Sequence, residues 1–277
     1  MPLVYACIAP HGEEIVPALA GKRLRLFSPT RKGMRSLAAA MREAEPDTIV
    51  LASPHNLRLH GYIGVVTAEY SSGRVAERGR EIRMRAKCDV EFSDRLVEAA
   101  ERTGLPVVAA NYGVSEGPLS DMAMDWGTMV PLWFLLRGTR LKSRIVIVTP
   151  SREIPLNQNI EFGRVIARVA KGGTKRVAFV ASADQAHRHR MNGPYGFDSR
   201  AAEYDGLVVD AIHSGRLDEA MRIEPGLIDG ARPDSLWQMA MLVGVLEVVP
   251  MKGELVSYQV PSYYGMLCAS YWPVGDQ

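Results

Sequence analysis

The sequence predicts an α/β protein in which helices cover both faces of a largely parallel or mixed central sheet, in three layers. Two observations predict this fold. Short, nearly continuous apolar runs, typical of strands buried on both faces, alternate with amphipathic helical patterns along the chain. No repeat, linker or shift of composition divides the 277 residues. We therefore expect a single domain spanning residues 1–277.

The expected strands are apolar runs rich in β-branched side chains. They span residues 3–9, 48–52, 63–67, 106–110, 144–149, 176–182 and 254–260. Pro10 and Pro54 directly or closely follow the first two runs. Because proline cannot donate to a sheet ladder, we expect these two strands to end there.

Helical patterns lie between the strands. They span residues 28–44, 92–103, 156–170, 201–214 and 236–246. Ser28 or Thr30 is expected to cap the first, and Gly104 and Gly215 to end the second and fourth. The last pattern is apolar on most sides, so we expect this helix to be buried.

Composition narrows the class of protein. Apolar residues make up 47% of the chain and charged residues 23%, which is ordinary for a globular protein. The net charge is only +2, and glutamates interrupt the basic cluster at 74–87, so we interpret that cluster as a solvated surface segment. We expect no nucleic-acid interface and no membrane span, because every apolar run is too short to cross a bilayer.

Cysteine usage and the first residues indicate a compartment. Cys7, Cys88 and Cys268 include no closely spaced pair, so neither a disulfide framework nor a zinc ribbon is expected. The first residues carry no basic segment followed by a long apolar one, so we expect no signal peptide. A reducing cytoplasm is the expected location.

Three of the six histidines each follow a predicted strand: His11, His55 and His187. Parallel strands bring their carboxyl ends to one edge of a sheet, where ligand crevices form. Two imidazoles and one carboxylate would suit Fe(II) and leave positions open for substrate and oxygen. The alternative is that each histidine is an ordinary loop residue.

The other three histidines fit this pattern less well. His60 lies near the start of a strand and His213 late in a helix, so we expect structural or surface roles. His189 follows His187 closely and is a candidate for the wall of the pocket.

Five short motifs in order resemble a known family. They are APHG at 9–12, SPHN at 53–56, DWGTMVPL at 125–132, SADQAHRH at 182–189 and GARPDSLWQMAMLVGVL at 230–246. Together they resemble the class III extradiol ring-cleavage dioxygenases, as in the catalytic chain of protocatechuate 4,5-dioxygenase and its uncharacterised relatives. The resemblance covers most of the chain.

The resemblance implies a chemistry. The family holds Fe(II) with two histidines and a glutamate, and a further histidine moves protons while O2 opens a catechol-like or aminophenol-like ring. By this resemblance His11 and His55 would bind the metal and His187 would be the acid–base. It also implies a small aromatic substrate, O2 and a homodimer.

The carboxylate ligand departs from the family pattern. No glutamate lies in GARPDSLW; Asp234 is nearest to the expected position, although it could instead cap the following helix. Glu203 is the rival ligand, and Glu13 and Glu14 are weaker ones.

A second departure is Trp126, which stands where many family members have histidine. We expect it to pack in the core, with stacking on a substrate ring as the alternative. Tyr263 is a further pocket candidate, although packing against the sheet is the simpler expectation. The turn-rich loop at 193–198 is expected to be a surface loop rather than a lid.

These departures leave two other classes of function open. Two histidines and a carboxylate also suit zinc and an activated water, so a zinc-dependent hydrolase is the first alternative. The second is a non-catalytic relative that binds a metal or ligand at the same site.

Overall fold

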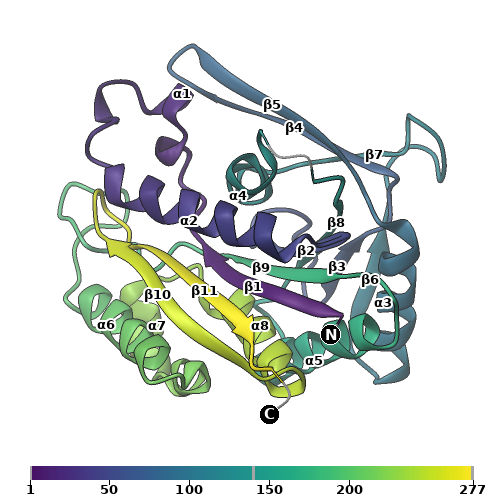
Figure 1. The fold of residues 1–277 in the computed structure, drawn as a ribbon. Helices are drawn as coiled ribbons and strands as arrows, with labels where there is room; N and C mark the ends of the chain where they lie inside the picture. The colour runs from purple at the N-terminus through teal and green to yellow at the C-terminus, as the bar shows by residue number, and fades with distance from the viewer. Residues whose placement is uncertain (1, 139–140, 276–277) are drawn as a thin grey trace.

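The computed structural model describes residues 2–138 and 141–275 and has an eight-stranded sheet at its centre (Figure 1). The strand order is β10-β11-β1-β9-β2-β8-β3-β6. In chain order these strands are β1 (Leu3–Ala9), β2 (Thr48–Ala52), β3 (Ile63–Val66), β6 (Val107–Ala110), β8 (Arg144–Thr149), β9 (Val177–Ser182), β10 (Met251–Gln259) and β11 (Met266–Pro273).

The four middle strands of the sheet are parallel, and an antiparallel pair joins them to the strands on each side. β1, β9, β2 and β8 run in one direction, whereas β3 is antiparallel to β8 and β11 is antiparallel to β1. Ala9 of β1 pairs with Ser182 of β9, and Ala52 of β2 pairs with Ala181. The carboxyl ends of β1, β9 and β2 are therefore level, and the segments that follow them leave the sheet at one edge.

Helices cover both faces of this sheet (Figure 1). One face carries α2 (Ser28–Ala44) and α4 (Trp126–Leu136). The other carries α3 (Val90–Arg102), α5 (Leu156–Lys171), α6 (Arg200–His213), α7 (Pro225–Ala231) and α8 (Leu236–Val248). Short elements complete the chain: 3-10 turns at Glu13–Ile15, Gly21–Arg23 and Leu217–Arg222, and α1 at Pro17–Ala20.

The two hydrophobic cores follow from strand alternation. In β1, Tyr5 and Cys7 face the core that includes α2, whereas Ala6 and Ile8 face the core that includes α5 and α8. Because both faces of a central strand are buried, its sequence is a continuous apolar run. The predicted three-layer α/β fold with a mixed sheet is confirmed.

Helices α5 and α8 meet at their backbones. A Cβ atom added to Gly163 in α5 would overlap the carbonyl oxygen of Met241, and one added to Gly244 in α8 would overlap that of Ile160. Only glycine permits this approach on both sides of the contact.

Most expected elements are present, with ends that differ by a few residues. The expected cap of α2 is wrong: Phe27 precedes the helix without a side-chain cap bond, and Ser28 is its first residue. The elements that were missed include α4, α7, β11 and the three strands of a second sheet. Proline inside α4 and high overall hydrophobicity hide its helical period.

The second sheet contains the basic cluster, which we had interpreted only as a surface segment. It has the order β5-β4-β7, with β4 at Tyr70–Glu77, β5 at Arg80–Lys87 and β7 at Asp121–Ala123. Arg78 and Gly79 both have positive φ and form the turn between β4 and β5. The exposed arginines are solvated as expected, but Ile82 on the opposite face is buried, so the segment is a hairpin packed on the protein.

Among the described residues, no helix combines the length and the apolar character that crossing a bilayer requires.

Candidate metal centre and active site

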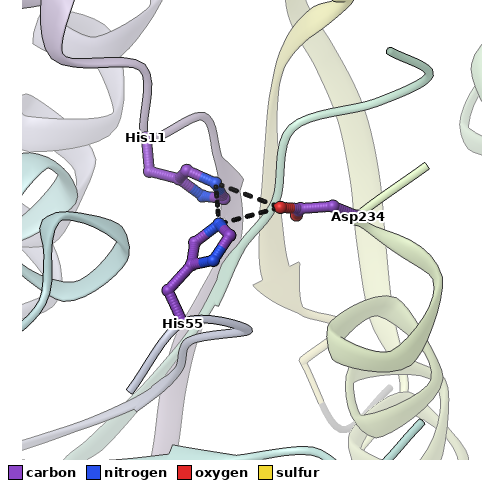
Figure 2. Close-up of side chains that lie close together, drawn as sticks. All are labelled: His11, His55 and Asp234. Atoms are coloured by element: carbon purple, nitrogen blue, oxygen red, sulfur yellow. Dashed lines mark hydrogen bonds and ion pairs between the residues drawn. The ribbon is translucent and has the colours of Figure 1, made fainter. Parts of the chain in front are cut away.

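The carboxyl edge of the sheet brings together residues far apart in sequence. His11 follows β1, His55 follows β2, and β9 lies between these two strands. Asp234 precedes α8 and reaches the same point from the other side (Figure 2). Its role as a helix cap is wrong, because the cap position of α8 is Ser235.

The three side chains converge on one point (Figure 2). The two Nε2 atoms of His11 and His55 are 3.2 Å apart. Asp234 Oδ2 lies 2.9 Å from Nε2 of His55 and 3.6 Å from Nε2 of His11. All three potential ligand atoms therefore lie within 4.8 Å of one another.

These separations fit a divalent metal. Ligand atoms about 2.1 Å from one ion, and about 90° apart, are separated by about 3.0 Å. The three observed separations, 2.9, 3.2 and 3.6 Å, lie around that value. In addition, Oδ1 of Asp234 is buried and has no hydrogen-bond partner among the described residues. Two imidazoles and one carboxylate on one side of an ion leave the other positions open.

The tautomer of His11 is set by its neighbour Ser182. The Ser182 hydroxyl donates to the carbonyl oxygen of Gly127 and lies 3.0 Å from Nδ1 of His11. Since the hydroxyl has only one hydrogen, it must accept from Nδ1, which therefore carries the imidazole hydrogen. Nε2 is left with its lone pair toward the site, as a metal ligand requires.

A second group of hydrogen bonds places His55. The amide of His55 donates to Oγ of Ser53, and that hydroxyl donates to Asp125. Asp125 also caps α4 by accepting from the amide of Thr128. The loop that carries His55 is thus tied to the first turn of α4.

Asp184 was missed as a site residue. It follows β9 within SADQAH, its Oδ1 accepts from the amide of His11, and its Oδ2 lies 3.3 Å from Nε2 of His11. A carboxylate directly after a central strand, in the same position as the histidines, was the signal that could have found it.

The carboxylates draw positive charge onto His11. Burial opposes its protonation, but Asp184 and Asp234 outweigh that effect and raise the pKa of His11 to about 9. Burial would raise the pKa of Asp234, yet His11 and His55 hold it below its usual range. Burial also raises the pKa of Asp184 to about 7. A cluster that favours a cation at Nε2 is suited to a proton or a metal ion.

His187 lies beside this cluster and is held by an aromatic neighbour. Its ring stacks on Tyr264 with centroids 5.3 Å apart and planes 12° apart, and its amide donates to the carbonyl oxygen of Ala231. Burial lowers the pKa of His187 below the ordinary value of 6.5. The imidazole is therefore neutral at pH 7 and free to accept a proton.

One cavity of about 840 Å³ is lined by His11, His55, Asp184, His187 and Asp234. Its other walls are aromatic and polar. They include Gly12, Glu13, Arg58, Trp126, Arg152, Tyr195, Ile228, Asp229, Arg232, Pro233, Trp237, Tyr263 and Tyr264. Aromatic walls around a polar centre are typical of a site for a small ring compound.

The positions of Trp126 and of the loop at 193–198 differ from what we expected. Trp126 is not in the core: it is 44% exposed and stacks on His55, with ring centroids 4.3 Å apart. Tyr195 lies in the loop that we expected to be an ordinary surface loop, yet it lines the cavity and its ring lies 6.0 Å from that of His187. Tyr263 also lines the cavity, as one of the two interpretations predicted.

Other candidates lie away from the metal cluster. Glu203 is exposed on α6 and lines a different hollow. His189 turns from the cavity because its Nε2 lies 2.9 Å from Oδ2 of buried Asp205, which also accepts from Tyr258. Glu14 is buried against Tyr264 and Arg23, whereas Glu13 reaches the cavity wall.

Comparisons with known proteins give a family and relatives for this chain. The sequence model of a family described as the catalytic LigB subunit of aromatic ring-opening dioxygenase matches residues 5–269. A relative, Protein CA_C1420 of Clostridium acetobutylicum, is 24% identical over 91% of this chain, which spans only 54% of that relative's length. The crystal structure of an uncharacterized protein, JW3007 of Escherichia coli K12, has the same fold, with a TM-score of 0.64 and 16% identity. That match covers 96% of this chain and 99% of the other.

Proposed function

We propose that this chain, which belongs to the family of the catalytic LigB subunit of aromatic ring-opening dioxygenase, uses Fe(II) and O2 to open a catechol-like or aminophenol-like ring. The cleavage would be extradiol, beside the paired substituents, with both oxygen atoms entering the product. The observation that supports it most is the convergence of His11, His55 and Asp234 in a cavity with aromatic walls.

In this proposal His11, His55 and Asp234 hold the metal through Nε2, Nε2 and Oδ2. Aspartate takes the place of the expected glutamate, and despite its shorter side chain its Oδ2 lies 2.9 Å from Nε2 of His55. When bound, the metal would hold the ring oxygens and O2 together and stabilise developing charge. Ser182 keeps His11 in the tautomer that leaves Nε2 free.

His187 is proposed as the acid–base. Because burial lowers its pKa, the neutral imidazole can take a proton from a ring hydroxyl and return it later in the reaction. Its stacking on Tyr264 limits the rotation of the ring, so the proton is received at a fixed place.

Trp126, Tyr195 and Tyr263 are proposed to orient the substrate ring and to exclude water. Their rings surround the cavity entrance and present faces and edges on which an aromatic ring can stack. Tryptophan cannot transfer a proton as the family's histidine would, so in this chain His187 carries the proton transfer alone.

The test is metal content followed by oxygen uptake. Protein purified anaerobically should hold about one iron per chain, and it should consume O2 with at least one catechol or aminophenol while a coloured ring-opened product forms. Zinc found alone calls for reloading with Fe(II) before the assay, because zinc binds the same ligands.

Two outcomes would overturn the proposal. Zinc-dependent hydrolysis without O2 uptake by the iron-loaded protein would favour a hydrolase. Failure to bind any metal after reloading would leave a non-catalytic binding protein. The expectations of a homodimer, a cytoplasmic location and no nucleic-acid partner stay predictions.

A further inference from the structure

One wall of the cavity carries an arginine that contacts no carboxylate among the described residues. Arg152 lies in the loop after β8, is half-buried, and places its guanidinium carbon 4.5 Å from the centre of the Trp237 ring. Among residues 2–138 and 141–275, no carboxylate oxygen lies within 4.0 Å of its guanidinium nitrogens. Trp237 belongs to the first turn of α8, so this wall lies next to Asp234 in the chain.

Several other arginines of the protein do contact a carboxylate. Arg164, Arg188 and Arg200 each bind a carboxylate at 3.1 Å or less. Arg58, which also lines the cavity, is 57% exposed and pairs with Glu153 at 3.6 Å. A charge withdrawn from water without a partner is costly, and it costs least where a ligand supplies the partner.

None of the acidic residues that line the cavity is in contact with Arg152. Asp184 and Asp234 both lie against Nε2 of His11, at 3.3 and 3.6 Å. Glu13 and Asp229 line other parts of the wall, and neither lies within ion-pair distance of Arg152. The cavity thus has a cluster of carboxylates around the imidazoles and a region where Arg152 feels the charges of Asp234 and Glu153 from a distance but contacts no carboxylate among the described residues.

Stacking prepares Arg152 for a particular anion. A guanidinium on an aromatic face is held by cation–π attraction, while its N–H groups stay free to donate. These paired N–H groups match the two oxygens of a carboxylate. Exposed Arg232, above Tyr195 at 5.9 Å, adds a second positive charge to the cavity wall.

We propose that Arg152, supported by Trp237, binds a carboxylate substituent on the aromatic substrate. The proposal rests on the proposed function for the identity of the ring, but not for the existence of the anion site. It makes Arg152 the residue that separates acidic catechols from neutral ones.

The test compares matched acids and esters. Metal-loaded protein is titrated anaerobically by calorimetry with 3,4-dihydroxybenzoate, 3,4-dihydroxyphenylacetate and 3-(3,4-dihydroxyphenyl)propanoate, and with the methyl ester of each. At least one acid should bind more tightly than its ester, by about tenfold or more, as a charge-assisted pair predicts. Arg152→Gln should abolish that preference and leave the affinity for the ester unchanged.

Arg58→Gln is the matched control. It removes a positive charge from the same cavity, but one that is exposed and already paired, so the acid should lose less than about threefold in affinity. Unchanged ester binding by Arg152→Gln shows that the pocket is still folded. Arg152→Lys should restore part of the preference for the acid, because it keeps the charge without the fork of donors.

The anion site would be overturned if the wild type bound every acid and its ester with equal affinity. It would also be overturned if Arg152→Gln lowered the affinity for acid and ester equally. Binding of no acid would overturn it too. Oxygen uptake separates this result from the proposed function. Selective binding of an acid without O2 uptake would support the anion site and contradict ring opening. O2 uptake with equal kcat/KM for acid and ester would support ring opening and contradict the anion site.

Discussion

The cavity has two walls of different construction. The wall around the metal cluster lies at strand ends and at the start of a helix. His11 is 2% exposed and Asp234 7%, and His55 is partly buried. His11 is fixed by hydrogen bonds that its ring and its amide donate to Ser182 and Asp184. The other wall comes from loops and a helix end, where Trp126 is 44% exposed and Tyr195 46%.

This difference separates two tasks. Metal binding depends on distances of a few tenths of an ångström, which only rigid elements and a hydrogen-bonded second layer provide. Recognition of a ring depends on apolar area and a few polar groups, which loops supply as well and can change more easily. Changes to the first wall should therefore abolish metal binding, while changes to the second should alter substrate choice and leave the metal bound.

The largest effect is expected at the carboxylate ligand. Asp234→Ala should lose the bound metal and reduce turnover by about a thousandfold or more, because it removes a ligand and leaves two buried imidazoles facing each other. Metal content by elemental analysis checks this. Glu203→Gln is the control, since Glu203 is exposed on α6. Loss of metal in Glu203→Gln, with metal retained in Asp234→Ala, would reverse the assignment of the ligand.

His187→Gln should lower kcat by about 10²- to 10⁴-fold, the usual contribution of a general acid–base, while the metal stays bound. His187 is not one of the proposed ligands, so loss of metal in this variant would contradict the division of roles. Stopped-flow oxygen uptake with the best substrate, at matched metal content, measures the effect.

The pH profile should follow the same residue. Because burial lowers the pKa of His187, its neutral form persists below pH 6.5 and is lost only as the pH falls through that lowered pKa. At constant metal occupancy, kcat/KM should decline on the acid side below pH 6.5. A decline that begins above pH 6.5, or one that survives unchanged in His187→Gln, would argue for another proton acceptor.

A smaller effect is expected from the group that fixes His11. Ser182→Ala removes the acceptor for Nδ1 of His11 and should weaken metal affinity by about 10- to 100-fold. Competition with a chelator of known affinity gives the value. Ser36→Ala, on the exposed face of α2, should bind metal as the wild type does. Equal affinity in both variants would mean that His11 is oriented without Ser182.

The smallest effect is expected on the loop wall. Trp126→Ala should raise KM by about 2- to 12-fold, as the loss of one ring contact predicts, with metal affinity and melting temperature little changed. A loss of stability of about 3 kcal/mol or more, as for a buried tryptophan, would instead support the original expectation of core packing.

The first wall was largely predictable from sequence, and the second was not. Strands with two buried faces are continuous apolar runs, and the histidines after them must meet where parallel strands end. His11 and His55 were therefore named in advance from the pattern, whereas Asp234 was named only from the resemblance to a known family. The distinction between Asp234 and Glu203 needed the structure, because it depends on how α6 and α8 are oriented.

The loop wall carries no comparable periodicity. Arg152, Tyr195 and Trp237 come from separate segments, and nothing in their local sequence shows that they face one cavity. His189 was misplaced for a related reason: buried Asp205, on another element, offers it a stronger partner than the cavity does. The hairpin β4–β5 was missed because its exposed arginines outweigh the alternation of its buried residues.

The glycine contact between α5 and α8 has a consequence for the metal site. Because Gly163 and Gly244 carry no side chain, the two helices pack backbone against backbone, and this contact fixes their position along each other. Asp234 lies just before the first residue of α8, so the position of the helix also sets the position of the ligand. A methyl group added at Gly244 would overlap the carbonyl oxygen of Ile160, so we expect it to move α8 and the carboxylate with it. The position of the carboxylate ligand therefore depends on a glycine contact inside the core, and neither glycine lines the cavity.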